Sequence, residues 1–338
     1  MKFSVKTRDF TYPIVVEQGA LERLDGVCDL ERRVLVVTDD GVPEAYAERV
    51  AAQCREPVVV RLPQGEATKT LESWARLLQT LLDHHFDRKD CVVAVGGGVM
   101  GDLAGFAAAS YMRGVDFYNV PTTLLSQVDS SIGGKTAVDF GGVKNSVGAF
   151  YPPRAVVIDP QTLKTLDARQ VACGMAETIK MAAAFDADFF TAIEAGLSAD
   201  DAEALIAGAL RIKRAVVEAD ETEKGLRRAL NFGHTVGHAI EANSALLHGE
   251  SIAAGMLYFA SGEARERIAA LLRREKLPTE TDVAPKRLME TLLHDKKAEA
   301  DGVVVVRVDE IGTHRLEKLS QEALWDVLTQ HASKGGRS

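Results

Sequence analysis

The chain has 338 residues, of which 46% are hydrophobic and 26% charged, and its formal net charge is −9. This is the composition of an ordinary globular protein, long enough for one large domain or for two domains with real cores. An acidic chain without a basic block is a poor general nucleic-acid binder, because neutralising phosphates needs clustered Lys and Arg.

The N-terminus and the cysteines indicate a soluble, cytoplasmic protein. The first residues are too polar to begin a signal peptide, and no apolar run approaches the roughly 18 residues of a membrane helix. The four cysteines are scattered and form no C-x-x-C pair, which favours buried, reduced thiols. We therefore expect no membrane partner and no nucleic-acid partner.

Strand and helix patterns alternate along the first 160 residues. Short β-branched runs predict buried parallel strands, and the amphipathic stretches between them predict helices. Strands are predicted within 3–16 and at 34–38, 58–60, 91–95, 117–120 and 155–158. Helices are predicted at 43–55, after 69 through 82, at 103–111 and from 122 onward. This alternation predicts an α/β, Rossmann-like domain with a mainly parallel sheet over 1–160.

Beyond residue 160 the pattern becomes mostly helical. Helical periodicity, rich in Ala, Leu, Glu and Arg, occupies 168–186, 199–219, 230–244, 249–268, 285–293 and 320–331. The run 303–307 and its predicted hairpin partner 313–319 interrupt this series. We therefore expect a second, mostly α-helical domain over 161–338 that binds metal and substrate.

Polar and glycine-rich turns follow the predicted strands of the first domain. They are Asp39-Asp40, Glu66–Lys69, Gly96–Asp102 and Thr122-Thr123. Ligands of parallel sheets bind at the carboxyl ends of the strands, where these turns meet. Gly96–Asp102 also leads from a strand into a helix, an arrangement that offers backbone N–H groups to a phosphate.

The helical half gathers its chemically active side chains in three places. Glu177 and Lys180 lie at i, i+3 on one helix face. In isolation such a pair is usually a surface ion pair, but the small and apolar neighbours indicate a buried face. The other two places are 227–238 and 247–250, which together hold three of the eight histidines. Three histidines within so short a span, beside a helix carrying a glutamate, suggest a divalent metal.

Spacing alone pairs His234 with His238 as metal ligands, because they lie at i, i+4. Thr235 stands where the H-E-x-x-H motif has its glutamate, so a zinc protease is not expected. A site of one Glu and two His leaves coordination positions for water or substrate, as catalytic metals require.

Several blocks of the sequence, taken together, resemble the 3-dehydroquinate synthase family. The blocks are Gly97–Asp102, Met112–Gly114, Pro121–Ser131, Gly133–Thr136, Lys144-Asn145, Asn231–Glu241, His248–Glu250 and Asp295–Lys297. They cover nearly the whole chain in the order of that family, which belongs to the sugar phosphate cyclases.

The resemblance implies a lyase of the shikimate pathway, which leads to aromatic amino acids. Members use NAD and a divalent metal, zinc or cobalt, to convert 3-deoxy-D-arabino-heptulosonate 7-phosphate into 3-dehydroquinate and phosphate. The implied steps are transient oxidation by NAD, phosphate elimination, re-reduction, ring opening and intramolecular aldol closure. Members also form homodimers, which places Arg113 within reach of a neighbouring subunit's site.

The resemblance also implies a role for individual residues. The metal ligands become Glu177, His234 and His248, so His238 changes from a ligand to a substrate contact. The implied NAD contacts are Asp39 or Asp40, Gly65, Glu66, Lys69, Gly98, Val99, Met100, Gly101, Asp102, Thr122 and Thr123. Lys135, Lys144, Thr162, Leu163, Lys164 and Thr165 are also predicted to bind the cofactor. The substrate and catalytic set is Arg113, Asp129, Lys135, Lys144, Asn145, Lys180, Lys213, Arg227, Asn231, His238 and Lys296.

Two other functions remain open from the sequence. The segment Val138–Val143 departs from the family's usual Asn-His-Pro-Leu-Gly-like run, and Pro152-Pro153 differs from its commoner Gln-Pro, which leaves room for a related sugar-phosphate cyclase with a different product. A metal-dependent polyol or glycerol dehydrogenase shares the two-domain design. It does not require the anion-binding set Lys135, Lys144, Asn145, Arg227 and Lys296.

Overall fold

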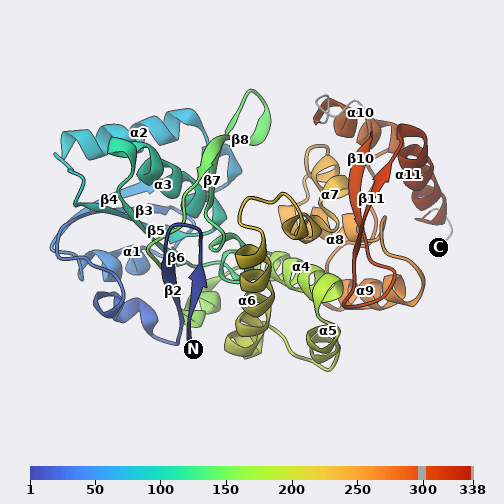
Figure 1. The fold of residues 1–338 in the computed structure, drawn as a ribbon, viewed down its shortest axis with the longest axis horizontal. Coiled ribbons are helices and arrows are strands. Elements are labelled where there is room, and N and C mark those ends of the chain that lie inside the picture. The colour runs from blue at the N-terminus through green and yellow to red at the C-terminus, as the bar shows by residue number, and fades with distance from the viewer. Residues whose placement is uncertain (296–301, 336–338) are drawn as a thin grey trace. The chain divides into compact units, whose positions relative to one another are not determined.

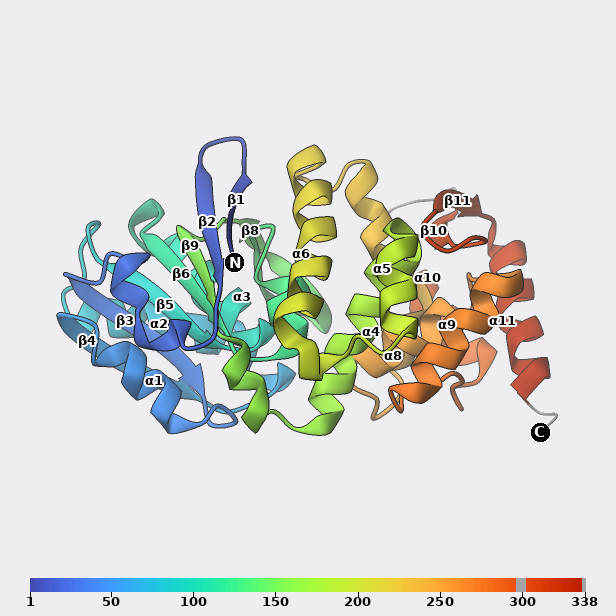
Figure 2. The same ribbon diagram turned by 90° about the horizontal axis from the view of Figure 1, so that it is seen from below.

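The computed structural model describes residues 1–295 and 302–335, which form two compact units. One, the α/β unit, comprises 1–167 and 202–210, and the other, the helical unit, comprises 168–201 and 211–338. Figures 1 and 2 show the sheet of the first unit and the helices of the second.

A seven-stranded sheet organises the α/β unit, in the order β1-β2-β9-β6-β5-β3-β4. Only β1 and β2 pair antiparallel; every other neighbouring pair is parallel, which confirms the mainly parallel sheet. The strands are β1 Lys2–Lys6, β2 Thr11–Val16, β3 Arg33–Asp39, β4 Glu56–Leu62, β5 Cys91–Gly96, β6 Asp116–Pro121 and β9 Ala155–Ile158.

Apolar layers cover both faces of this sheet, as the continuous β-branched runs predict. Within β3, Val34 and Val36 pack on one face with α1 (Glu44–Ala51) and the short 3-10 turns before the strand. Leu35 and Val37 pack on the other face with α2 (Leu71–Asp83) and α3 (Gly98–Ser110). The sheet is therefore buried between helices, and its carboxyl edge is the place where polar turns gather.

An antiparallel hairpin, β7 (Lys135–Phe140) and β8 (Val143–Phe150), follows β6, although periodicity does not predict it. Gly141 and Gly142 form its two-residue turn, with φ of 62° and 79°. Two positive φ values at a two-residue loop are typical of a tight β-hairpin, for which Gly-Gly is a strong sequence signal. The departure from the family pattern at Val138–Val143 thus lies at a hairpin turn.

The helical unit contains α4 Ala168–Phe185, α5 Ala187–Glu194, α7 His234–Glu241, α8 His248–Met256, α9 Gly262–Arg274, α10 Pro285–Asp295 and α11 Gln321–Gly335. The helix α6 (Ala202–Ala219) contributes residues to both units. The predicted hairpin is confirmed as β10 (Val303–Arg307) paired with β11 (Arg315–Leu319).

Some predicted boundaries are wrong. The third helix begins at Gly98, not at Leu103, so the glycine-rich turn is already helical. The stretch predicted as one helix over 249–268 is two helices, and α5 lies between 186 and 199, where the periodicity predicts no helix. The helix expected from 122 onward includes an irregular π-helical turn, Ser126–Ser130. Short polar or glycine-containing segments carry too little periodic signal to place such breaks.

Two glycines let three helices of the helical unit approach closely. A Cβ atom at Gly249 in α8 would overlap the backbone of Cys173 in α4, and one at Gly255 would overlap the carbonyl oxygen of Gly233, just before α7. Backbones that approach this closely leave no room for a side chain. The middle of α4, which carries Glu177, and the first residues of α7 and α8, His234 and His248, are thereby held together.

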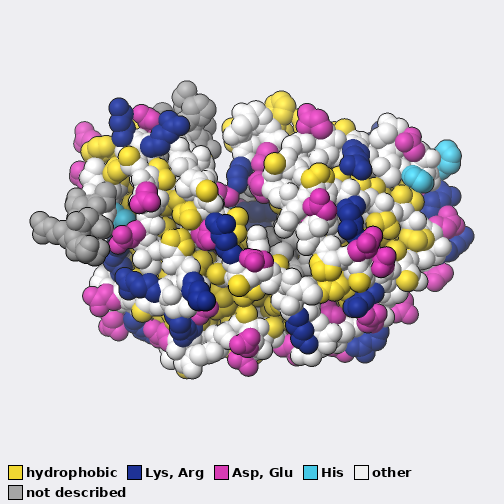
Figure 3. Space-filling model, turned by 180° about the vertical axis from the view of Figure 1, so that it is seen from behind, with side chains coloured by type: hydrophobic (Ala, Val, Ile, Leu, Met, Phe, Trp, Pro, Cys, Tyr) yellow, Lys and Arg dark blue, Asp and Glu magenta, His cyan; other side chains and the backbone are white. Residues whose placement is uncertain are grey.

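The expectation of buried cysteines is confirmed for three of the four. Cys28, Cys91 and Cys173 are buried free thiols, while Cys54 is partly exposed. No helix among the described residues is long and apolar enough to cross a bilayer. On the face drawn in Figure 3, basic and acidic side chains are interspersed rather than gathered in one block.

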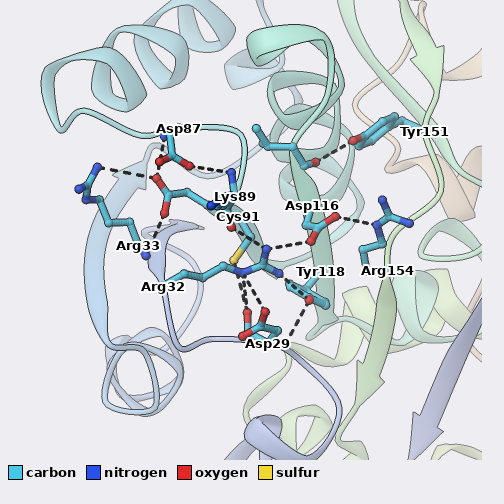
Figure 4. Close-up of polar contacts among 12 residues, drawn as sticks. Asp29, Arg32, Arg33, Asp87, Lys89, Cys91, Asp116, Tyr118, Tyr151 and Arg154 are labelled. Carbon is cyan, nitrogen blue, oxygen red and sulfur yellow. Dashed lines mark hydrogen bonds and ion pairs between the residues drawn. The ribbon is translucent and has the colours of Figure 1, made fainter.

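A polar network ties together the amino ends of the central strands (Figure 4). Asp116, the first residue of β6, accepts hydrogen bonds from Arg32 Nη1 at 2.8 Å and from Arg154 Nε at 2.7 Å. Arg32 Nη2 also donates to the Tyr118 hydroxyl at 2.8 Å. Burial opposes the charge of Asp116, but the two guanidinium groups outweigh it and lower the pKa of its carboxyl.

The Asp116→Asn variant is expected to lower the free energy of unfolding by about 1–3 kcal/mol at pH 7, because two guanidinium groups lose their charged acceptor. A carboxyl whose folded pKa is depressed stabilises the fold above its unfolded pKa of about 4 and loses this contribution as pH falls through the lower folded value. Urea unfolding at pH 7, 5 and 3 should therefore show a difference from wild type that shrinks only at pH 3.

The control is Glu22→Gln, which removes an exposed ion pair with Arg49 and should change stability by less than about 0.5 kcal/mol. A difference between Asp116→Asn and wild type that stays constant down to pH 3 would contradict the assigned charge of Asp116.

Candidate functional site

The centre of the helical unit is a buried acid–base pair on α4. The side chains of Glu177 and Lys180 are each 2% exposed, and Lys180 Nζ donates to Glu177 Oε2. The other carboxylate oxygen, Glu177 Oε1, is buried and accepts no hydrogen bond. The alternative of a surface ion pair is therefore wrong, because a carboxylate oxygen in this position needs a further positive or hydrogen-bonding partner.

Two imidazoles face that oxygen. His248 Nε2 lies 3.4 Å from Glu177 Oε1, and His234 Nε2 lies 3.9 Å from it. Each is the first residue of its helix, α8 and α7, and the close packing of these helices brings them together. One carboxylate oxygen and two imidazole nitrogens thus converge on one point, the donor set expected of a catalytic divalent-metal site.

Both imidazoles are hydrogen-bonded through their other nitrogen. His234 Nδ1 lies 3.3 Å from the carbonyl oxygen of Phe232, and His248 Nδ1 lies 3.2 Å from Glu241 Oε2. An acceptor at Nδ1 favours the tautomer that carries its hydrogen there, which leaves the Nε2 lone pair free to bind a cation. Outer partners of this kind usually accompany metal-ligating histidines.

The electrostatics of the two histidines differ. Burial lowers the pKa of His234 well below 6.5, and the nearby Lys180 lowers it further, so this imidazole is neutral. Burial also opposes the charged form of His248, but the carboxylates of Glu177 and Glu241 outweigh it and raise the pKa to about 9. The carboxylates therefore create a field that favours positive charge beside His248.

His238 lies in the same cluster. Its ring centroid is 5.1 Å from that of His234 and 5.7 Å from that of His248, and one nitrogen from each ring lies within 4.8 Å of the others. The pairing that spacing suggests, His234 with His238, is thus also compatible with the geometry. His238 is the most exposed of the three, which suits a group that meets a substrate.

Three further predicted substrate residues of the helical unit are wholly or partly buried. Lys213 on α6 is 7% exposed, and Arg227 is 1% exposed. The Arg227 guanidinium donates to the carbonyl oxygen of Glu221 at 2.6 Å. Asn231 Nδ2 donates to Glu223 Oε1 at 2.7 Å. Lys296 lies outside the described residues.

The predicted cofactor residues of the α/β unit occupy the carboxyl edge of its sheet. Asp39 ends β3; it is 7% exposed, and burial raises the pKa of its carboxyl. Its Oδ1 accepts a hydrogen bond from the Gly41 N–H at 2.9 Å. Gly65, with φ of 104°, precedes the 3-10 turn Glu66–Thr68.

The polar residues after these turns are hydrogen-bonded to one another. Lys69 is 4% exposed, and its Nζ donates to Asp102 Oδ2 at 2.5 Å and to Asn145 Oδ1. Lys144 Nζ lies 3.7 Å from Glu66 Oε1. Three of the predicted residues, Lys69, Asp102 and Asn145, are therefore hydrogen-bonded to one another, and Asn145 belongs to the β7–β8 hairpin.

The glycine-rich turn begins a helix, as a phosphate site requires. Gly98, Val99, Met100, Gly101 and Asp102 form the first turn of α3, and its N-cap, Gly97, provides no side-chain hydrogen bond. The first N–H groups of such a helix lack intrahelical partners. Thr122 and Thr123 follow the neighbouring strand β6; Thr122 N donates to the carbonyl oxygen of Gly96 at 2.9 Å.

The last segment of the cofactor set is hydrogen-bonded within the protein. In the 3-10 turn Pro160–Thr165, the Thr162 hydroxyl accepts from Gln127 Nε2 at 3.0 Å, and the Thr165 hydroxyl lies 2.9 Å from that of Tyr46. Leu163 is buried and Lys164 is exposed. These contacts fix the turn beside the carboxyl end of β9, and its contact with the cofactor stays a prediction.

The other predicted residues of this unit differ in exposure. Asp129 is buried in the π-helical turn, whereas Lys135 is exposed at the start of β7. Arg113 is exposed on a turn with a φ of 69°, an unusual conformation for a residue other than glycine. Such an exposed position is compatible with contact to another subunit.

Two carboxylates near the histidines have no role in the sequence-based prediction. Glu241 contacts His248, as described above. Glu250 forms a double ion pair with Arg169, at 2.5 and 2.7 Å, and accepts from the Leu247 N–H at 2.8 Å. The sequence could have pointed to Glu241 through its spacing, because it lies seven residues after His234 and therefore on the same face of α7.

Family models match consecutive parts of the chain. The model described as 3-dehydroquinate synthase N-terminal matches residues 59–173, and that described as 3-dehydroquinate synthase C-terminal matches residues 174–298. A protein from Desulforamulus reducens named 3-dehydroquinate synthase is 42% identical, over 94% of this chain and 96% of its own.

Solved structures of related enzymes have the same fold. A 2-deoxy-scyllo-inosose synthase complexed with carbaglucose-6-phosphate, NAD⁺ and Co²⁺ is 25% identical, with a TM-score of 0.87, over 98% of this chain and 100% of its own. The 2-epi-5-epi-valiolone synthase of Streptomyces hygroscopicus subsp. jinggangensis, with bound NAD⁺ and Zn²⁺, is 26% identical, with a TM-score of 0.87, over 97% and 99%. Because the two family models together cover 59–298 and the Desulforamulus relative spans nearly the whole chain, this chain belongs to the 3-dehydroquinate synthase family.

Proposed function

We propose that this chain is a 3-dehydroquinate synthase, which cyclises 3-deoxy-D-arabino-heptulosonate 7-phosphate and releases phosphate with the help of NAD and a divalent metal. The observation that carries the proposal is the buried Glu177 Oε1, which has no hydrogen bond and faces the Nε2 atoms of His234 and His248. Together with family membership, this arrangement favours a catalytic metal over a structural ion pair.

The residues present fit such a metal. Glu177 supplies a charged oxygen, the two histidines supply Nε2, and His238 stands beside them as a group that contacts the substrate. Glu177 is a better third ligand than His238, because the buried carboxylate oxygen of Glu177 would have no compensating positive charge if the metal did not bind it. We therefore assign Glu177, His234 and His248 as ligands.

The residues of the α/β unit fit NAD. The uncapped start of α3 suits the pyrophosphate, and Asp39 at the end of β3 suits a ribose hydroxyl. A metal held by the three assigned ligands would supply Lewis-acid polarisation of a substrate hydroxyl, and bound NAD would supply a hydride acceptor that returns the hydride to the same carbon, so that no net NADH is expected.

Basic and amide side chains of the chain bind and orient the anionic substrate. Lys180, Lys213 and Arg227 are buried in the helical unit. Lys135, Lys144 and Asn145 belong to the hairpin of the α/β unit. In this proposal they hold the phosphate and carboxylate groups and stabilise the negative charge that develops on elimination.

Two finer assignments belong to this proposal. A homodimer is inferred from the family resemblance, and the exposed turn that carries Arg113 supports contact with a second subunit. A cyclase with a different product is the second candidate, because the Gly141-Gly142 turn departs from the usual family sequence.

The purified protein, loaded with NAD and Zn²⁺, should release one phosphate per heptulosonate phosphate consumed, with no net NADH, because the hydride is returned. Phosphate release, absorbance at 340 nm and NMR of the product would measure this. Stoichiometric NADH would instead identify a dehydrogenase. Turnover of a hexose 6-phosphate, with none of the heptulosonate, would identify a cyclase with another product.

Removing either type of ligand should abolish metal binding and activity. His248→Ala should weaken Zn²⁺ binding at least 100-fold with little loss of stability, because this side chain is 36% exposed. Glu177→Gln should also lose metal, and it should destabilise the protein by about 3–5 kcal/mol, because Lys180 is left buried without its carboxylate. Competition with a coloured chelator and urea unfolding in EDTA measure the two effects.

The matched control is Glu290→Gln, which removes an exposed carboxylate 3.6 Å from Arg287 on α10. It should leave metal affinity unchanged. Full activity and unaltered Zn²⁺ affinity in either ligand variant would show that the metal is assigned to the wrong residues.

Asp39→Ala should weaken NAD binding by about 10-fold or more, because a ribose hydroxyl loses a charged acceptor worth about 1.5–3 kcal/mol. The neighbouring Asp40→Ala provides the comparison: Asp40 accepts from the Gln64 N–H at 2.7 Å. Calorimetric titration of each variant with NAD distinguishes them. A larger loss in Asp40→Ala than in Asp39→Ala would assign the ribose contact to Asp40.

A further inference from the structure

The two histidines assigned as metal ligands are held by different acceptors. The acceptor for His234 Nδ1 is a neutral carbonyl group, that of Phe232, whereas the acceptor for His248 Nδ1 is a carboxylate, that of Glu241. Glu241 is the last residue of α7, and its side chain is 13% exposed. On the side of Glu241, its contact at 3.2 Å is largely shielded from water, which strengthens a charged hydrogen bond.

The need for a charged partner follows from the position of His248. As the first residue of α8, it lies at the positive end of the helix dipole, where a further positive charge is disfavoured. Its imidazole is also partly exposed, so packing alone does not fix the ring. A carboxylate at Nδ1 offsets the field, fixes the ring orientation and makes Nε2 a better electron donor.

We propose that Glu241 is a positioning residue for the metal site. It does not bind the metal. It holds the imidazole of His248 so that Nε2 points to the position that Glu177 Oε1 and His234 Nε2 also face. This inference rests on the metal site of the proposed function and extends it by one residue. The carboxylate of Glu241 contacts Nδ1 of the His248 imidazole, and Nε2, on the opposite side of the ring, faces Glu177.

The test uses the full-length protein, freed of metal and titrated with Co²⁺ alone, without NAD or substrate. Glu241→Ala should weaken Co²⁺ binding by about 10- to 100-fold, the usual effect of removing an outer partner of a ligating histidine. The visible absorption bands of the saturated Co²⁺ form should keep their positions, because the ligands themselves are unchanged. Glu241→Gln, which keeps an acceptor oxygen but no charge, should fall between Glu241→Ala and wild type.

Two further variants make the result specific. Glu263→Gln removes a carboxylate that is 84% exposed on α9, and it should bind Co²⁺ like wild type. His248→Ala should lose or visibly alter the Co²⁺ bands, since it removes a ligand. Urea unfolding of the metal-free proteins checks that Glu241→Gln, the variant of closest shape, is folded.

Three outcomes would overturn the role of Glu241. Unaltered Co²⁺ affinity in Glu241→Ala would show that it does not support the site, and shifted bands would show that it is a ligand. An equal loss in Glu263→Gln would show a general effect of charge. Failure of the wild-type protein to bind Co²⁺ would be a different result, because it would overturn the proposed metal site as well.

Discussion

The burial of one carboxylate constrains the whole helical unit. Glu177 lies within α4, almost entirely shielded from water, and an ionised carboxylate there is stable only if both oxygens find partners. Lys180 satisfies one oxygen from the same helix. The other oxygen faces two imidazoles from other helices, and a divalent cation between these three groups would compensate it. A bound cation would therefore offset the unfavourable free energy of burying the Glu177 carboxylate.

Close helix packing makes that convergence possible. Gly249 and Gly255 let α8 pack against α4 and against the start of α7. The first residues of α7 and α8, His234 and His248, therefore lie beside Glu177. Further polar contacts stabilise the same region. Glu250, paired with Arg169, fixes the first turn of α8, and Glu241 meets His248 from the end of α7. Side chains held by such surroundings keep their relative geometry when a ligand binds.

The α/β unit follows a different principle. Its buried parallel strands all end at one edge, so turns from distant parts of the sequence meet there without specific design of each contact. Lys69 after the 3-10 turn that follows β4 and Asp102 in the first turn of α3 show the result, because they are hydrogen-bonded to each other; Asn145 of the β7–β8 hairpin joins them. This arrangement explains why the polar turns after the strands were informative in the sequence, even though each turn alone is a weak signal.

The sequence by itself determined the alternation of buried strands and helices, the change to a helical second half, and the blocks of residues that identify the family. These features are local or repeat along the chain, so periodicity and short motifs record them. The small and apolar neighbours of Glu177 and Lys180 already indicated a buried face, which the structure confirms. Periodicity did not predict the hairpin over 135–150. Tertiary structure alone decided that the second carboxylate oxygen of Glu177 faces His234 and His248, and that Glu241 contacts His248. Spacing favoured His238 as the partner of His234, because it sees only neighbours on one helix. His248 and Glu177 come from other helices, and only the packing of those helices brings their side chains to the same point.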